Sequence, residues 1–240
     1  MDTHAQQHDE AERDRAADPA EAGPRRWSRS ARVCLGATSL VIVLLLVSAF
    51  IVQPFLIPSS SMTPTLGVGD RVLVNKLAYR FGNSPGRGDV VVFDGTDSFV
   101  SEEAGEGNPV TGLLRGAGAA VGLLKPSETD YVKRVIGVGG DRVRCCNKRG
   151  RIEVNGVPVD EGYLQHGDDP SAVPFDVEVP QGRLWVMGDH RSDSSDSRDH
   201  LGDPGGGTVP VTRVIGRADW IGWPARRWGS VSGATAGAHE

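Results

Sequence analysis

The chain has 240 residues and a formal net charge of −5, which leaves room for one substantial core with a small additional lobe and excludes two large domains. A net charge this small gives no indication of a nucleic-acid partner. The 32 glycines and 15 prolines follow no period and aromatic residues make up 6%, so we expect many turns and a mainly β fold.

The first segment, residues 1–32, is predicted to be a disordered cytoplasmic tail, because its first part carries almost no large apolar side chains to offset the entropy of ordering. An uncharged stretch follows at 33–52. At about 1.5 Å per residue it is long enough to cross the roughly 30 Å hydrocarbon layer of a bilayer as one helix. Arginines stand just before it, at Arg25, Arg26, Arg29 and Arg32. Because positive charges stay on the cytoplasmic side, the rest of the chain is expected outside.

The same stretch is also compatible with a cleavable secretory signal. Val47, Ser48 and Ala49 would make an acceptable cleavage site, which would leave Phe50 as the first residue. However, the apolar run is long for such a signal and the tail before it is longer than usual. We therefore predict a retained transmembrane helix.

Residues 53–229 are predicted to form an extracytoplasmic domain of antiparallel β-sheet. Runs rich in β-branched residues, bounded by Gly, Pro and Asp, predict strands at 71–77, 89–93, 131–138 and 183–188. A hairpin is predicted at 151–159, where two alternating runs flank an Asn-Gly dipeptide.

An acidic and Gly-rich insertion at 94–128 interrupts these strands. Its apolar part, 112–124, is too short and too rich in glycine to span a membrane. We predict a surface loop, and a loop that dips into the membrane surface is the alternative. At the other end, residues 230–240 are small and polar and are predicted to form a flexible tail.

The three cysteines do not have the spacing of a zinc or redox site. Cys34 lies in the apolar stretch, and Cys145 and Cys146 are adjacent. We expect no metal and no cofactor. The adjacent pair is interpreted as two free or buried thiols, with a disulfide in an oxidising compartment as the alternative.

A candidate nucleophile follows the transmembrane stretch. Serines crowd the segment 57–66, and Pro58 and Pro64 restrict its backbone. A serine such as Ser61 could be presented rigidly to a substrate at the membrane surface. On composition alone, an ordinary loop is the better explanation.

A serine hydroxyl needs a base that removes its proton, and three routes exist. A Ser-His-Asp arrangement could use His166, His190 or His200, but GxSxG is absent and no histidine has a distinctive setting. The SxxK pattern is absent, because no lysine has a serine three positions before it. The third route is a lysine from a distant strand, and Lys133 is the best candidate.

Lys133 can act as a base only if its pKa falls. A free lysine has a pKa of about 10.4, and desolvation can lower it to roughly 7 to 8. Strand alternation would place Tyr131, Lys133 and Val135 on one face, and Val132, Arg134 and Ile136 on the other. This pattern permits burial of Lys133, although an exposed strand lysine is the simpler explanation of the pattern alone.

A third polar cluster, at 186–202, combines small hydroxyl and carboxylate side chains after an apolar strand. Asp189, Asp196 and Arg198 could form an ion-pair framework that orients a lysine. A calcium-binding loop is the alternative, but the EF-hand pattern of ligands, central Gly and distal Glu is absent.

Together the ordered segments resemble type I signal peptidases, serine proteases that cut signal peptides from exported preproteins. The resemblance covers the apolar stretch and most of residues 54–219. It rests on PSSSMTPTL, GDRVLVNKLAYR, RGDVVVF, YVKRVIGVGGD, GDHRSDSSDSR and VIGRA, in that order. It implies a mainly β fold, with an antiparallel catalytic core, a small inserted β lobe at 145–183 and one preceding transmembrane helix.

The resemblance also implies site residues. Ser61 matches the nucleophile and Lys133 the general base, and Ser59 matches the residue whose hydroxyl joins the nucleophile's N–H in the oxyanion hole. Ser194 matches a serine that hydrogen-bonds the lysine, and Asp196 and Arg198 match supporting residues. The family commonly has Asn where this chain has His190.

The implied activity is acyl transfer without a cofactor, with signal peptides and the lipid bilayer as partners. Substrate is expected to bind as an added strand, with small side chains entering pockets. Two other functions stay open. One is a self-cleaving protease of the LexA type, although the sequence shows no DNA-binding domain of the kind that such repressors carry. The other is an inactive extracytoplasmic β module that binds secreted chains. The sequence does not indicate an oligomeric state.

Overall fold

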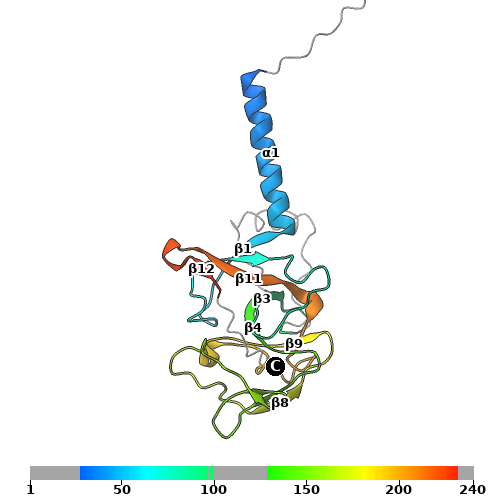
Figure 1. The fold of residues 1–240 in the computed structure, drawn as a ribbon, viewed down its shortest axis with the longest axis vertical. Coiled ribbons are helices and arrows are strands. Elements are labelled where there is room, and N and C mark those ends of the chain that lie inside the picture. The colour runs from blue at the N-terminus through cyan, green and yellow to red at the C-terminus, as the bar shows by residue number, and fades with distance from the viewer. Residues whose placement is uncertain (1–27, 97, 100–128, 232–240) are drawn as a thin grey trace, which may run out of the picture. The chain divides into compact units, whose positions relative to one another are not determined.

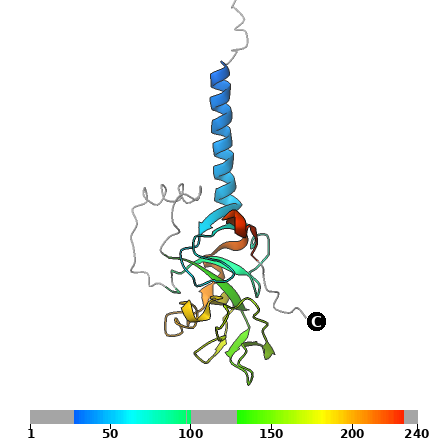
Figure 2. The same cartoon turned by 90° about the vertical axis from the view of Figure 1, so that its left-hand side faces the viewer.

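The computed structural model describes residues 28–96, 98–99 and 129–231 (Figures 1 and 2). Most of the predicted tail at 1–32, nearly all of the insertion at 94–128 with its apolar part, and nearly all of the tail at 230–240 lie outside these residues.

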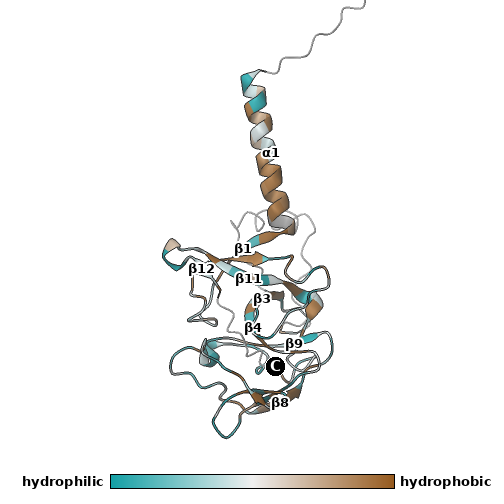
Figure 3. Ribbon diagram, viewed as in Figure 1, coloured by the Kyte–Doolittle hydropathy of each residue, from teal (hydrophilic) through white to brown (hydrophobic). Residues whose placement is uncertain are grey.

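The apolar stretch forms one helix, α1 (Arg29–Phe50). It begins before the predicted start because Ser28 caps it: the Ser28 hydroxyl accepts a hydrogen bond from the N–H of Ala31 at 3.2 Å. The span Arg29–Val47 is long and apolar enough to cross a membrane by length and composition. Figure 3 shows α1 as hydrophobic along most of its length, with hydrophilic residues at its N-terminal end. A cleavable signal would meet the same criterion, so the helix alone does not decide between the two.

In the remaining described residues, the regular secondary structure is mainly antiparallel β-sheet, as predicted. The larger sheet has the order β1-β2-β11-β3-β4-β9-β10, and β12 pairs with β11. Its strands are β1 (Val52–Leu56), β2 (Arg71–Asn75), β3 (Val90–Asp94), β4 (Asp130–Val138), β9 (Arg183–Met187), β10 (Val209–Pro210), β11 (Val214–Trp223) and β12 (Gly229–Ser230). Three short 3-10 helices occupy the connections: η1 (Arg191–Asp193), η2 (Val211–Arg213) and η3 (Ala225–Arg227).

A second sheet has the order β7-β6-β5-β8. Its strands are β5 (Arg142–Cys145), β6 (Glu153–Val154), β7 (Val157–Pro158) and β8 (Phe175–Glu178). The predicted hairpin is confirmed: β6 pairs with β7 around Asn155 and Gly156, whose φ angles are +53° and +79°. Both turn residues have the positive φ that a two-residue hairpin turn needs, and Asn and Gly tolerate it best.

The second sheet shares its core with the larger one. Ile152, Val154 and Phe175 pack in one cluster with Trp185 and Met187 of β9. The Phe175 and Trp185 ring centroids are 5.2 Å apart. Strand β9 therefore packs against the smaller sheet, and the polar segment that begins at Gly188 follows it directly.

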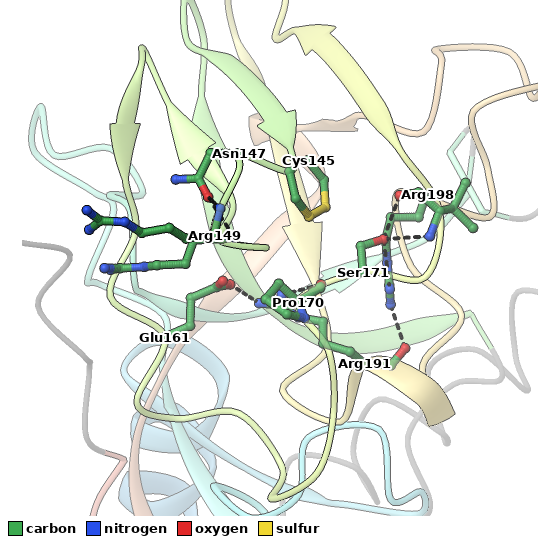
Figure 4. The surroundings of a disulfide bond; sticks show 11 residues. Cys145, Asn147, Arg149, Glu161, Pro170, Ser171, Arg191 and Arg198 are labelled. Carbon is green, nitrogen blue, oxygen red and sulfur yellow. Dashed lines mark hydrogen bonds and ion pairs between the residues drawn. A yellow bond between two sulfur atoms is a disulfide. The ribbon is translucent and has the colours of Figure 1, made fainter.

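One interpretation of the cysteines is wrong in this structure. The Sγ atoms of Cys145 and Cys146 are joined in a disulfide, so they are not two free thiols (Figure 4). Adjacent cysteines have their sulfurs within reach of each other, but adjacency alone does not distinguish the thiol state from the disulfide state.

Candidate active site

The segment between β1 and β2 holds Ser61 against the protein interior. The two ends of this segment are joined by a hydrogen bond, which the N–H of Ile57 donates to the carbonyl of Asp70 at 2.8 Å. Met62 and Leu66 are buried in the apolar core that also receives the inward side chains of β1 and β2. Because these two apolar residues enter the core, the neighbouring Ser61 is only 8% exposed.

Strand β4 brings Lys133 to Ser61. The distance between Lys133 Nζ and Ser61 Oγ is 2.9 Å. Lys133 is 4% exposed, so the explanation of an exposed strand lysine is wrong. Burial lowers the pKa of Lys133 from 10.5 to about 8, and the negative charge of Asp196 only partly opposes that shift. A lysine in this state can accept a proton near neutral pH.

Ser59 lies beside the same hydroxyl. Its Oγ is 3.3 Å from Ser61 Oγ. A hydroxyl at this position can donate a hydrogen bond to an oxyanion that forms next to Ser61, together with the Ser61 backbone N–H.

Behind Lys133, the next residue of β4 forms a buried ion pair. The Arg134 guanidinium donates to both carboxylate oxygens of Asp189, at 2.7 and 2.6 Å, and both side chains are 0% exposed. Arg134 also donates to the carbonyl of Gly88 at 2.8 Å. The Thr65 hydroxyl donates to Asp189 and so links this pair to the segment that carries Ser61. Asp189 was among the predicted site residues, whereas its partner Arg134 was not.

The segment 188–198 supplies a second ion pair. Arg198 donates to both oxygens of Asp196, each at 2.8 Å. Burial alone would raise the pKa of Asp196, but the hydrogen bonds and charge of Arg198 hold it below its ordinary value. Ser194 Oγ donates to Asp196 at 2.9 Å, and no hydrogen bond joins Ser194 to Lys133 among the described residues. The resemblance had implied that Ser194 hydrogen-bonds the lysine.

Gly188 lies where this segment meets the nucleophile. A Cβ atom at Gly188 would overlap both the Ser194 side chain and the carbonyl oxygen of Ser61. Other hydrogen bonds join the same two segments: His190 N to Ser61 O, Thr63 Oγ1 with His190 Nδ1, and Ser60 Oγ to Asp193. His190 therefore contacts the nucleophile segment through Thr63, and its ring makes no hydrogen bond to Ser61 in this part of the structure.

A third buried ion pair ties the segment 188–198 to residues 161–171 (Figure 4). Arg191 and Glu161 lie 2.6 Å apart, and their side chains are 1% and 6% exposed. Arg191 also donates to the carbonyl of Pro170 at 2.6 Å, and its own carbonyl accepts from Arg198 at 2.8 Å. Neither Arg191 nor Glu161 was predicted, and only the long-range fold reveals that they meet.

A cavity of about 180 Å³ opens beside Ser61 and Lys133. Its walls come from the end of β1 and the segment after it, and from the start of β4. Phe55, Ile57, Met62 and Val132 provide apolar lining. A cavity this small and apolar suits a small aliphatic side chain next to a reacting carbonyl.

Several known proteins are similar to this chain in sequence. The family described as "Signal peptidase, peptidase S26" matches residues 30–223. Signal peptidase I of Mycobacterium tuberculosis is 42% identical over 238 residues, which cover 90% of this chain and 80% of that protein. The probable signal peptidase I of Mycobacterium leprae is 44% identical over 76% of this chain and 72% of its own. Signal peptidase IB of Staphylococcus aureus is 31% identical over 76% of this chain and 84% of its own. The chain therefore belongs to the signal peptidase family, peptidase S26, and is a hydrolase of that family.

Proposed function

We propose that this chain is a membrane-bound serine endopeptidase that removes N-terminal signal peptides from exported preproteins, with Ser61 as nucleophile and Lys133 as general base. The observation that carries this proposal is the 2.9 Å separation of Lys133 Nζ and Ser61 Oγ, with Lys133 4% exposed. Family membership supports the reaction, and the geometry supports the two residues.

The reaction begins with neutral Lys133. With a pKa of about 8, roughly a tenth of this side chain is neutral at pH 7. Lys133 takes the Ser61 proton as Oγ attacks the scissile carbonyl, and the Ser61 N–H and the Ser59 hydroxyl stabilise the oxyanion. The lysine then gives its proton to the leaving amine. Finally it activates a water molecule, which releases the new carboxylate and restores the Ser61 hydroxyl.

Substrate binds in an extended conformation along the cavity. Strand β4 pairs with β9 only from Arg134 onward, so β9 does not cover the edge at 130–133. The facing wall is the end of β1, which lies at the edge of the larger sheet. An added strand between these edges would place alternate side chains in the apolar cavity.

The proposal includes the location of the enzyme. Helix α1 is retained as a single anchor, the residues before it stay in the cytoplasm, and residues 53–229 form the extracytoplasmic peptidase domain, with 145–183 as its small lobe. Ser61 follows the anchor closely in sequence, so it acts near the outer membrane surface, where signal peptides emerge. N-terminal sequencing of the mature protein tests the anchor, and a chain that begins at Phe50 would refute it.

Cleavage of a preprotein tests the catalytic assignment. Ser61→Ala and Lys133→Ala should each lower kcat about 10³-fold or more, because neither residue can be replaced by its partner. Lys148→Ala, which removes an exposed lysine from the connection between β5 and β6, is the matched control and should keep full activity. Full activity in either active-site variant would show that the assignment of the two residues is wrong. If wild type itself did not cleave the preprotein, the inactive β module would be favoured instead.

A further inference from the structure

A second cavity lies on the smaller sheet, in the connection between β5 and β6. It has a volume of about 580 Å³, within the range of small-molecule sites. Its lining includes Arg144, Lys148, Arg149 and Arg151, with Glu153 as the acid among them. We call this cavity the basic hollow. Nothing in the proposed peptidase mechanism uses it.

The basic hollow is strongly positive in a chain that is negative overall. Its lining carries four positive charges and one negative charge, which leaves three positive, against a net −5 for the whole chain. Glu153 is already paired with Arg144 at 2.5 Å. Within the described part of the chain, the Lys148 ammonium and the Arg149 guanidinium form no hydrogen bond or ion pair. These two charges are therefore available to a ligand.

The turn that carries these cations is fixed by its own hydrogen bonds. The Asn147 side-chain oxygen accepts from the N–H of Arg149 at 2.9 Å and from the N–H of Arg151 at 3.1 Å (Figure 4). The N–H of Gly150 donates to the Asn147 carbonyl at 2.9 Å, and Gly150 has φ +74°, which favours glycine. The Arg151 guanidinium is held by the carbonyl of Val159.

Such a turn is arranged before any ligand arrives. Clustered like charges repel one another and do not help the chain to fold. A preformed site loses less conformational entropy on binding than a flexible one. A fixed backbone turn that gathers cations around one cavity is thus better explained by a bound anion than by stability.

The geometry favours a phosphate group as that anion. Phosphate carries up to two charges and several acceptor oxygens on one atom, so it can contact several cations of one cavity at once. Carboxylates on one side of an extended acidic peptide stand roughly 6 to 7 Å apart and carry one charge each. We propose that the basic hollow binds a phosphate group, supplied either by a phospholipid headgroup or by a water-soluble phosphate compound.

Titration with pyrophosphate tests the site. The full chain in a neutral detergent is titrated by calorimetry, alongside the double variant Lys148→Gln, Arg149→Gln. Both side chains are exposed and form no hydrogen bond or ion pair among the described residues, so the variant should fold normally. Loss of two exposed charge contacts should weaken pyrophosphate binding about tenfold. Arg226→Gln removes one exposed arginine from η3, far along the chain, and should leave the affinity unchanged.

Lipid nanodiscs distinguish the two sources of phosphate. If anionic phospholipid discs weaken pyrophosphate binding relative to zwitterionic discs, a headgroup occupies the hollow. If both discs give the same affinity, a soluble phosphate compound is the ligand. The proposal fails if pyrophosphate does not bind, if the double variant and Arg226→Gln bind it equally well, or if hexaglutamate binds more tightly than pyrophosphate. Since Ser61→Ala should keep pyrophosphate binding, this result is independent of the peptidase proposal.

Discussion

The active site and the basic hollow both contain clusters of charged side chains, but the charges are buried and paired in the active site and exposed in the hollow. In the active site each buried guanidinium has a carboxylate partner: Arg134 with Asp189, Arg191 with Glu161 and Arg198 with Asp196. In the hollow, Lys148 and Arg149 are exposed and form no ion pair within the described residues. Burial demands pairing because a lone charge away from water is costly, whereas solvent stabilises the exposed charges.

Lys133 is the exception that gives the active site its chemistry. Its hydrogen-bond partner is the neutral Ser61 hydroxyl, and burial lowers its pKa to about 8. The paired arginines hold the backbone around it while the lysine itself stays poorly compensated. The exposed cations of the hollow keep their charge, which suits binding and not proton transfer.

The largest expected effect comes from breaking a buried pair. Asp189→Ala leaves the Arg134 guanidinium buried without a carboxylate and should lower the free energy of unfolding by about 3 to 5 kcal/mol. Denaturant unfolding of the full chain in neutral detergent measures this loss. Asp176→Ala is the control, since Asp176 pairs with Arg142 in an exposed position, and it should cause no comparable loss. Equal losses in the two variants would contradict the contrast between buried and exposed pairs.

The next effect is on the pH dependence of cleavage. Because only neutral Lys133 can take the Ser61 proton, kcat/KM should rise with an apparent pKa of about 8 and fall about tenfold for each pH unit below it. At pH 6 the rate should be about a hundredth of its plateau. The folded chain binds this proton less tightly than the unfolded one, so the lysine's contribution to stability rises between pH 8 and 10.5.

A pH–rate profile of wild type and Lys148→Gln checks this prediction. The two profiles should coincide, because Lys148 is exposed and lies outside the active site. A profile that rises only near pH 10 would mean that Lys133 is not desolvated in the working enzyme.

A smaller effect is expected from the pair that ties residues 161–171 to the active site. Glu161→Gln keeps the shape of the side chain but leaves Arg191 without its carboxylate. The Arg191 carbonyl then positions Arg198 less accurately, and kcat should fall about tenfold with little change in KM. Glu161→Asp should restore part of the activity, and Glu178→Gln on β8 is the exposed control. If Glu161→Gln changed KM and left kcat unchanged, the pair would act on substrate binding instead.

Much of the fold could be predicted from local sequence. Alternating β-branched runs predicted β2, β3, β4 and β9, and the Asn155-Gly156 turn predicted the β6–β7 hairpin. The strands that were missed are short or lack this pattern. Strand β1 contains Pro54, β5 alternates with arginines, and β11 is broken by glycines and by register shifts against its neighbours.

The residues of the active site also fall into some that could be predicted from the sequence and some that could not. Ordered motifs predicted Ser61 and Lys133, while residue chemistry alone could not show that Lys133 is buried. Arg134 was missed because alternation placed it on the other face of β4, where it pairs with Asp189 behind the lysine. Glu161 and Arg191 are separated by 30 positions, and only the packing of the smaller sheet against β9 brings them together.

The smallest expected effect is on the stability of the basic hollow. Lys148→Gln with Arg149→Gln removes like charges that repel one another and breaks no hydrogen bond or ion pair of the described residues, so the free energy of unfolding should rise by about 0.5 kcal/mol or less at low salt. The gain should disappear at high salt, where exposed charges are screened. Denaturant unfolding at both salt concentrations measures it, and cleavage activity should not change. A loss of stability at low salt would mean that these cations support the fold, and the hollow would then need no ligand to explain it.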